Sequence, residues 1–213
     1  MKKPRNSKSG DDVSGKFPDP ELIRRAAEAL KRGGAVVFPT RGLYGLGADA
    51  LSRDAVEKIF AIKKRSREKP LLILAEDLEA VRGLVTDIPP AGEKIARRFW
   101  PGRVTLVLKA AAHLPENLTA KTGKIGVRIP GHPVARALVR AMGGPVTGTS
   151  ANLSGSPGCR RVSDIPGEMI RACDGVLDAG ILEGGPGSTV VDVTLPEPAI
   201  IRQGAVLKED LFS

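Results

Sequence analysis

The sequence is poor in the residues on which common catalytic and metal-binding sites depend. Its 213 residues include only two histidines, His113 and His132, and only two cysteines, Cys159 and Cys173. None of them has a Cys or His neighbour at metal-ligand spacing, and two cysteines make no disulfide framework. The sequence therefore predicts no metal site and favours a reducing compartment. A Ser-His-Asp hydrolase would have to use one of the two histidines, and His132, in PGHP, is more typical of a turn or a helix cap.

Aromatic side chains and long apolar runs are also scarce. One Trp, one Tyr and five Phe offer little material for stacking the bases of a nucleic acid. The longest apolar stretches have only the length of a strand, so we expect no membrane-spanning segment. The N-terminal residues contain no apolar run that would serve as a signal peptide. Together these features predict a cytoplasmic protein with no membrane partner.

Two familiar phosphate-binding signatures are missing as well. The chain has no G-x-x-x-x-G-K-S/T stretch, and GLYGLG (42–47) lacks the glycine spacing of a dinucleotide fingerprint. A nucleotide would therefore have to be bound by a different arrangement of residues.

What the sequence does have is positive charge. The formal net charge is +9 at pH 7, and five cations against three acids up to Asp19 account for +2 of it. We expect residues 1–18 to form a flexible basic tail and residues 19–213 to form one domain, and the remaining +7 lies on the residues after Asp19. That excess predicts an anionic partner, either a nucleic acid or a phosphorylated small molecule.

Helix and strand patterns alternate along the chain, which predicts a three-layer α/β fold with a twisted mixed sheet and helices on its faces. The first helix should be capped by Asp19 and should bury Leu22, Ile23, Ala26 and Leu30. Helices are expected over 20–34, 52–65, 77–85, 89–100 and 132–142, and a turn over 39–47. Strands are expected over 35–38, 71–75, 104–109, 125–129, 145–149, 175–180, 188–193 and 198–202.

Five cations crowd into KKRSREKP (63–70). Lys63 and Arg65 would point about 200° apart on a continuing helix, so they converge only if the helix ends there. Pro70 favours such an end, because it pushes Lys69 into an extended conformation. The stretch is then either a solvated helix end, whose cations interact favourably with the helix dipole, or half of an anion site.

Two further stretches place polar side chains at strand ends. TGTSANLSG (147–155) contains Ser150 and Asn152 just beyond a strand, where ligands bind in open α/β sheets. The glycines of GGPGSTVVD (184–192) would let the backbone approach a ligand closely near Ser188. An ordinary polar turn and a simple loop remain the alternative interpretations.

Single residues in apolar surroundings give a second signal. Arg128 lies inside the strand pattern IGVRIP, where a charge needs a partner or a polar cavity, and Arg202 in AIIRQG repeats that pattern. Thr40 directly follows a buried strand. Tyr44, the only tyrosine, is expected to be a packing residue.

Together these stretches resemble the YrdC-like family of threonylcarbamoyl-AMP synthases, from about residue 20 to 208. The family's K-x-R element is similar to Lys63-Lys64-Arg65 followed by KPL, and its S-x-N element to Ser150-Ala151-Asn152. VFPT, YGLGA, WPG, GVRIP, SANLSG and STVVD occur in the order typical of the family.

The chain also departs from the family's pattern. Arg41 and Gly42 stand where an acidic residue and then Thr or Ser are common, and Gly187 replaces an acid. Thr149 precedes Ser150 where proline is usual. These changes leave the identity of the amino-acid substrate open.

The resemblance implies a YrdC-like three-layer fold with a basic cavity, without the extra C-terminal domain of the longer members. It implies a nucleotidyltransferase that joins L-threonine, bicarbonate or CO2, and ATP into threonylcarbamoyl-AMP and pyrophosphate, for threonylcarbamoyladenosine in tRNA. Mg2+ would be carried in with ATP. Implied partners are the downstream proteins that transfer threonylcarbamoyl to tRNA, with contact to tRNA or double-stranded RNA.

The resemblance also implies roles for particular residues. Lys63 and Arg65 would be catalytic, and threonine would lie among Thr40, Arg128 and Ser188. The nucleotide would be bound by Lys63, Arg65, Lys69, Ser150, Asn152 and Arg202.

Two other interpretations stay open. One is an RNA-binding module without catalysis, acting on tRNA or ribosomal RNA, which would show steep salt dependence and no pyrophosphate release. The other is related carbamoyl-adenylate chemistry on a different substrate, which Arg41 and Gly187 permit. The sequence does not identify the base that would deprotonate the substrate amine.

Overall fold

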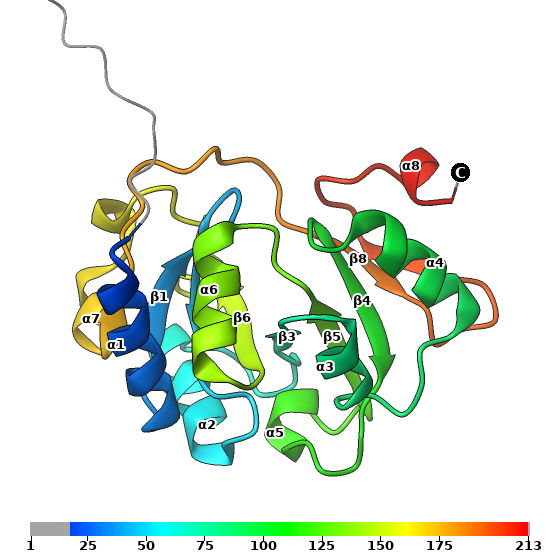
Figure 1. Ribbon diagram of the computed structural model, residues 1–213, viewed down its shortest axis with the longest axis horizontal. Helices are drawn as coiled ribbons and strands as arrows, with labels where there is room; N and C mark the ends of the chain where they lie inside the picture. Colours follow the sequence, from blue (N-terminus) through cyan, green and yellow to red (C-terminus); the bar gives the residue numbers. More distant parts are fainter. Residues whose placement is uncertain (1–17, 213) are drawn as a thin grey trace, which may run out of the picture.

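The computed structural model describes residues 18–212, so the tail expected at 1–18 lies outside the described residues except for Pro18 (Figure 1). The helices are α1 (Pro20–Lys31), α2 (Arg53–Lys63), α3 (Leu78–Arg82), α4 (Pro90–Phe99), α5 (Glu116–Thr119), α6 (Pro133–Met142), α7 (Gly167–Arg171) and α8 (Lys208–Phe212). The strands are β1 (Val36–Pro39), β2 (Tyr44–Gly47), β3 (Leu72–Leu74), β4 (Val104–Lys109), β5 (Lys124–Arg128), β6 (Val146–Ser150), β7 (Gly175–Val176), β8 (Thr189–Asp192) and β9 (Ala199–Arg202).

The strands form one mixed sheet in the order β7-β1-β2-β6-β3-β5-β4-β8-β9. The pairs β1–β7, β3–β5 and β4–β8 are parallel, and the other neighbours are antiparallel. The predicted mixed α/β architecture is therefore confirmed.

α1 and α6 lie side by side over β1 and β6 and form one outer layer (Figure 1). α1 begins as predicted, because Asp19 accepts a hydrogen bond from the Glu21 N–H at 2.8 Å. Ile23 and Leu30 of α1 are buried in the apolar cluster between this layer and the sheet. The expectation for Leu22 was wrong, since its side chain is 46% exposed. It precedes Ile23 by one residue and therefore points about 100° away from it.

The opposite face of the sheet is covered by α2, α3, α4 and α5. Alternate residues separate the two faces, so that Val37 and Ile73 belong to this second apolar cluster whereas Phe38 and Leu74 belong to the first. Buried side chains from the covering helices complete it: Val56, Ile59, Phe60, Val81, Ile95 and Leu118. Helices on both faces confirm the three-layer prediction.

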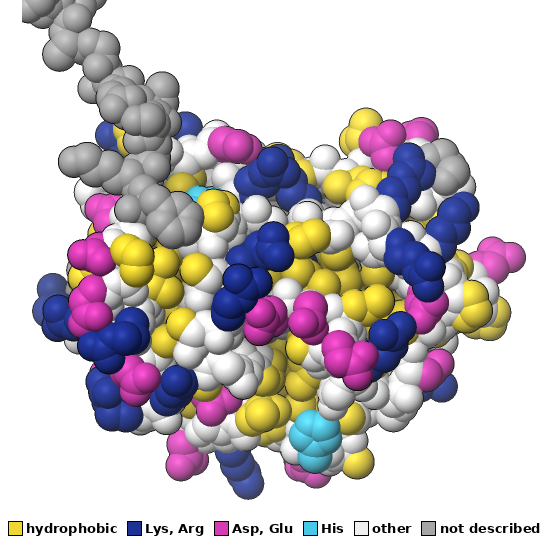
Figure 2. Space-filling model, in the orientation of Figure 1, with side chains coloured by type: hydrophobic (Ala, Val, Ile, Leu, Met, Phe, Trp, Pro, Cys, Tyr) yellow, Lys and Arg dark blue, Asp and Glu magenta, His cyan; other side chains and the backbone are white. Residues whose placement is uncertain are grey.

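Figure 2 shows Lys and Arg side chains interspersed with Asp and Glu on the face drawn there, without a continuous stripe of one sign. That face lacks the clustered positive patch typical of a nucleic-acid-binding surface. Within residues 18–212, no helix has the length and apolar character needed to cross a membrane.

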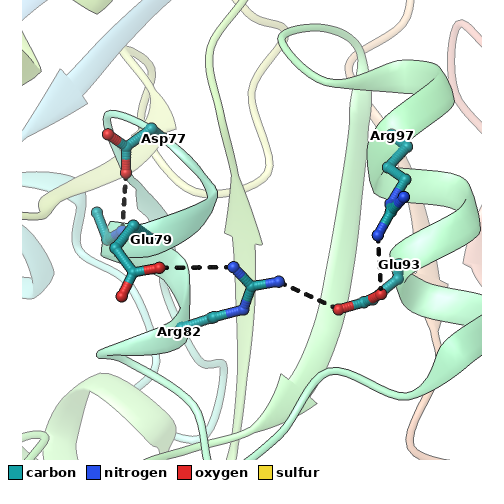
Figure 3. A network of polar contacts seen from close by, with 6 residues as sticks. Asp77, Glu79, Arg82, Glu93 and Arg97 are labelled. Atoms are coloured by element: carbon teal, nitrogen blue, oxygen red, sulfur yellow. Dashed lines mark hydrogen bonds and ion pairs between the residues drawn. The ribbon is translucent and has the colours of Figure 1, made fainter.

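A polar network links α3 to α4 (Figure 3). Arg82 contacts Glu79 at 3.5 Å and Glu93 at 3.2 Å, and Glu93 also pairs with Arg97 at 3.4 Å. Asp77 caps the start of α3. The network connects the two helices at the surface, and exposed ion pairs of this kind add little net stability.

The turn expected over 39–47 was wrong in its second half. Thr40 to Leu43 do form a turn, closed by the Thr40 N–H to Leu43 O bond of 3.0 Å. Tyr44–Gly47, however, is β2, which pairs with β1 and with β6. The glycines concealed the strand pattern, yet close packing requires one of them, because a Cβ at Gly47 would lie 2.3 Å from Thr147 O.

Three short helices were not predicted at all. α5, α7 and α8 have at most five residues each. A helix that short completes too few turns to show an apolar periodicity in the sequence.

Tyr44 is fully buried, as expected of a packing residue, and its phenol also holds the segment after β7. The hydroxyl lies 2.8 Å from both Asp178 Oδ1 and Gly180 O, and it accepts a bond of 2.9 Å from the Ala179 N–H. Burial, with the Asp178 carboxylate adding to it, raises the pKa of Tyr44. The phenol therefore stays neutral and acts as a structural link.

We predict that Tyr44→Phe lowers the free energy of unfolding by about 1–3 kcal/mol, because the Ala179 N–H would lose its acceptor in the interior. Thermal unfolding followed by circular dichroism measures the change. Ser66→Ala, which removes an exposed hydroxyl, serves as the control and should leave the melting temperature unchanged. A Tyr44→Phe protein as stable as the parent would contradict the structural role of the phenol.

Candidate functional site

A cavity of about 700 Å³ lies over one face of the sheet, beside the start of α6. Much of its floor consists of alternate residues at or next to five adjacent strands, because side chains alternate between the two faces of a strand. These floor residues are Gly148 and Ser150, Leu72 and Leu74, Gly126 and Arg128, Thr105 and Val107, and Ser188 and Val190. In the sheet register Gly148 and Gly126 flank Leu72, so the middle of the floor carries little side-chain bulk.

Positive charge dominates the lining of this cavity. Six cations contribute to it: Arg41, Arg65, Lys69, Arg103, Arg128 and Arg202. None of the lining residues in the described part of the chain is Asp or Glu. The basic cavity that the sequence predicted is therefore present, and much of the unexplained positive charge gathers in it.

The segment after α2 delivers Arg65 and Lys69 to the cavity. α2 ends at Lys63, close to the helix end that the sequence predicted, and Lys64 then adopts a left-handed conformation with a φ of 50°. Arg65 then folds back and donates to Lys69 O at 3.3 Å and Pro70 O at 3.0 Å. Lys64 points elsewhere and pairs with Glu168 of α7 at 2.9 Å.

Lys63 is placed differently from Arg65, because it lies beneath the site and does not line the cavity. Its side chain is only 2% exposed. The ammonium donates to Ser150 O and to the O and Oδ1 atoms of Asn152, at 2.6 and 3.3 Å. Burial, with a further contribution from Arg65, lowers the pKa of Lys63 to about 8, so the ammonium is still charged at neutral pH. Lys63 thus fastens the end of β6 to the end of α2.

Ser150 and Asn152 are likewise split between the lining and the layer beneath it. Ser150 lines the cavity, whereas Asn152 is buried and does not. Asn152 accepts from Ser150 Oγ and from Lys63, and its amide donates to Leu153 O at 3.1 Å. Asn152 therefore orients the serine hydroxyl and the loop.

Arg128 and Arg202 both line the cavity, near enough for their charges to interact. Arg128 Nε is buried and has no hydrogen-bond partner among the described residues. Burial, and secondly the charge of Arg202, lower the pKa of Arg128 to about 10. Arg202 donates to Ser188 O at 2.9 Å and to Ser188 Oγ at 3.3 Å, and Ser188 Oγ lies 2.8 Å from Thr105 Oγ1. Two neighbouring guanidiniums without an acid make a receptor for a carboxylate or phosphate.

The rim of the cavity is built by Thr40, Arg41, His132 and the Arg103–Glu183 ion pair. Thr40 Oγ1 donates to Leu43 O at 2.6 Å and so closes its own turn. His132 caps α6 through Nδ1, which accepts from the Val134 N–H at 3.3 Å, as the predicted cap role requires. Burial lowers the pKa of His132, Glu183 opposes this and Arg41 adds to it. The imidazole is therefore held in its neutral form.

Of the nine residues that the sequence assigned to a site, seven line the cavity: Thr40, Arg65, Lys69, Arg128, Ser150, Ser188 and Arg202. Lys63 and Asn152 do not. Arg103, Thr105 and His132 were missed as cavity residues. Thr105 lies in the predicted strand 104–109 and Arg103 just before it, but neither was assigned a role from the sequence, and the pairing of β4 with β5 and β8 brings them to the floor and rim.

We predict that substitution of Lys63 lowers stability, whereas substitution of Arg65 weakens ATP binding. Lys63→Met should lower the free energy of unfolding by about 1–3 kcal/mol, because it leaves the buried carbonyls of Ser150 and Asn152 without a donor. Arg65→Gln should leave the melting temperature nearly unchanged but weaken the binding of ATP by roughly 10- to 150-fold, the usual worth of a charged hydrogen bond.

Thermal unfolding and calorimetric titration with ATP measure both effects. Lys64→Gln removes the same charge from outside the cavity and is the matched control, which should retain ATP affinity. A Lys63→Met protein with unchanged stability, or an equal loss of ATP binding in the control, would contradict these roles.

The chain is similar to proteins of known family over most of its length. The Sua5/YciO/YrdC family model, described as "Telomere recombination", matches residues 28–204. A threonylcarbamoyl-AMP synthase of Pyrococcus abyssi is 35% identical over 89% of this chain and 56% of its own length. One of Methylococcus capsulatus is 44% identical over 62% of this chain and 72% of its own.

A solved structure agrees with these sequence matches. The crystal structure of P. abyssi Sua5 complexed with L-threonine superposes with a TM-score of 0.87 at 35% identity, covering 91% of this chain and 57% of the other. The chain thus spans little more than half the length of the P. abyssi protein. With the family model matched over residues 28–204, the chain belongs to the Sua5/YciO/YrdC family.

Proposed function

We propose that this protein is an L-threonylcarbamoyladenylate synthase, which forms threonylcarbamoyl-AMP and pyrophosphate from L-threonine, bicarbonate or CO2, and ATP. The observation that carries the proposal is the convergence of seven motif residues from six separate segments on one cation-lined cavity. Relatives bearing the name threonylcarbamoyl-AMP synthase support it, as does the P. abyssi structure with L-threonine. We further propose that the product serves threonylcarbamoyladenosine formation in tRNA, through downstream transfer proteins in the cytoplasm.

The reaction asks the protein mainly to position two anions. An oxygen of the threonine carbamate attacks the α-phosphorus of ATP, the bond from that phosphorus to the β-phosphate bridging oxygen breaks, and pyrophosphate leaves with the electron pair. Fixed cations and N–H groups stabilise the charge that builds up on the phosphates. We assign Arg65, Lys69, Ser150 and Arg202 to the nucleotide.

Mg2+ enters this scheme as part of the nucleotide substrate. No cluster of His, Cys, Asp or Glu suited to a metal ion occurs among residues 18–212, and the cavity lining there has no carboxylate. The phosphate oxygens would therefore supply the negatively charged ligands of the ion.

Lys63 and Asn152 take supporting roles in the proposal. They hold the loop that carries Ser150 in place from below, as their shared hydrogen bonds indicate. Both residues of the K-x-R element then serve the nucleotide, Arg65 by contact and Lys63 by fixing the wall of the cavity.

We predict that pyrophosphate is released from ATP only when L-threonine and bicarbonate are both present. A coupled pyrophosphate assay with each of the twenty amino acids, with and without bicarbonate, measures this. Equal turnover with serine or without an amino acid would contradict the threonine assignment. Nucleic-acid binding that falls steeply with salt, without any pyrophosphate release, would favour an RNA-binding module instead.

The threonine end of the site is assigned to Thr40, Arg128 and Ser188. Arg128→Lys should weaken threonine binding at least about tenfold, because an ammonium cannot reproduce the two parallel hydrogen bonds of a guanidinium to a carboxylate. Calorimetric titration with threonine measures the affinity, and ATP binding without threonine is the internal control. No described acid pairs with Arg128, so the melting temperature should not fall. Unchanged affinity with a lowered melting temperature would make Arg128 structural.

A second candidate is the same chemistry on a different amino acid. It is favoured by Gly187, which leaves Arg202 unopposed: a Cβ there would lie 3.3 Å from Arg202 Nη2. Arg41 adds a further cation to the rim. Pyrophosphate release that threonine does not stimulate but another amino acid does would establish this alternative.

A further inference from the structure

The proposed reaction needs an amine with a free lone pair, although threonine carries an ammonium at neutral pH. Carbamate formation from bicarbonate converts R–NH3+ and HCO3− into R–NH–COO−, water and one proton. The nitrogen lone pair forms the new N–C bond, and the proton must leave. Either a side-chain base accepts it, or the site lowers the pKa of the ammonium enough for water or buffer to take it.

The described lining offers no free carboxylate, phenolate or imidazole base. No Asp or Glu lines it within the described residues. Tyr44 lines the cavity, but its hydroxyl is engaged by Asp178, Ala179 and Gly180. His132 is the one lining histidine, and its Nδ1 already accepts from the Val134 N–H. In the neutral imidazole the other nitrogen then carries the hydrogen and has no lone pair to offer.

The six cations that line the cavity disfavour a bound ammonium, because they carry the same charge. Only Arg103 among them has a carboxylate partner, Glu183, in the described part of the chain. Arg65 and Arg202 donate to backbone carbonyls, which carry no negative charge to offset a cation. Arg128 is left with a buried unpartnered Nε, and Arg202 lies near enough to affect its ionisation. A like charge in such surroundings disfavours the protonated form of an amine.

We propose that the cationic lining itself deprotonates the amino-acid substrate: Arg41, Arg128, Arg202 and their neighbours repel the ammonium, expel its proton to solvent, and then stabilise the carbamate dianion that forms. No residue of the described lining acts as the general base in this step. The inference rests on the proposed function, since it concerns the amino acid in that site. It also explains why a cavity for a zwitterion carries cations and no carboxylate in its described lining.

The groups that face a bound amine determine its titration. From the strands these are Arg128 of β5 and Arg202 of β9, and from the loops Arg41, Arg65, Lys69 and Arg103. His132 at the start of α6 is held neutral, and Tyr44 of β2 is neutral as well. Glu183 is the acid at the rim, and it is neutralised by Arg103.

The test follows the amine of bound L-threonine directly, without turnover. 13C-labelled L-threonine is titrated between pH 6 and 10 in CO2-free buffer with the full chain, and the Cα chemical shift is measured by NMR. We expect at least tenfold more free amine in the complex than in free threonine at the same pH. Arg41→Gln, which removes an exposed cation from the rim, should reduce that excess. Lys64→Gln, which removes one from outside the cavity, should not.

The outcomes separate the inference from the proposed function. Threonine that binds with an unshifted amine titration, or an Arg41→Gln titration identical to that of the parent, would overturn the inference alone. Threonine that does not bind at any pH would overturn the proposed function and the inference with it.

A second measurement tests His132 as a competing base. His132→Asn keeps a good N-cap for α6 while removing the imidazole. We expect the acid limb of pyrophosphate release against pH to keep its midpoint in this variant. Loss of that limb would identify His132 as the base and overturn the inference.

Discussion

Arg128 carries its guanidinium on the floor of the sheet, where Nε is buried and no described residue accepts its hydrogen bond. Neighbouring strand positions Val127 and Ile129 are apolar and buried, so this charge is held in a place where an unpaired ion is costly. The cost is offset by the two apolar clusters on either side of the sheet. The site exists because those clusters are stable enough to hold like charges near one another.

The hydrogen bonds of one buried cation hold the wall of the cavity in place. Lys63 satisfies its ammonium entirely with oxygens of Ser150 and Asn152, so the loop after β6 cannot move without unpairing a buried charge. Arg65, two residues later, is freed for the cavity because the helix ends at Lys64. One helix terminus thus supplies both the anchor of the loop and a cation for the ligand.

Preorganisation of this kind suits the proposed chemistry. Phosphates and a carboxylate that enter a cavity with fixed cations meet their partners without reorganising them. The absence of acids from the described lining means that every lining charge acts in the same direction. In the proposed reaction, the described lining contributes an electrostatic field and fixed positions, and the reacting groups belong to the substrates.

The sequence by itself determined the mixed α/β architecture, most element positions and seven of the polar and charged residues that line the cavity. Apolar strand runs such as VTLVLK and capped helices such as the one after Asp19 are local signals, and the structure reproduces them. The end of α2 was also a local matter, because Pro70 and the crowded cations disfavour a longer helix. Strand β2 was not predicted because its glycines obscure an alternating pattern, and one of its two pairing partners, β6, lies about a hundred residues away in the chain.

Only the tertiary structure decided which motif residues contact the cavity and which lie beneath it. Lys63 and Arg65 look alike in sequence, yet one is buried under the β6 loop and the other faces the ligand space. That difference depends on where the Ser150–Asn152 carbonyls lie, which is a property of strand packing rather than of the K-x-R element. The same holds for Thr105 and Arg103, because sheet register, a long-range property, brings them to the site.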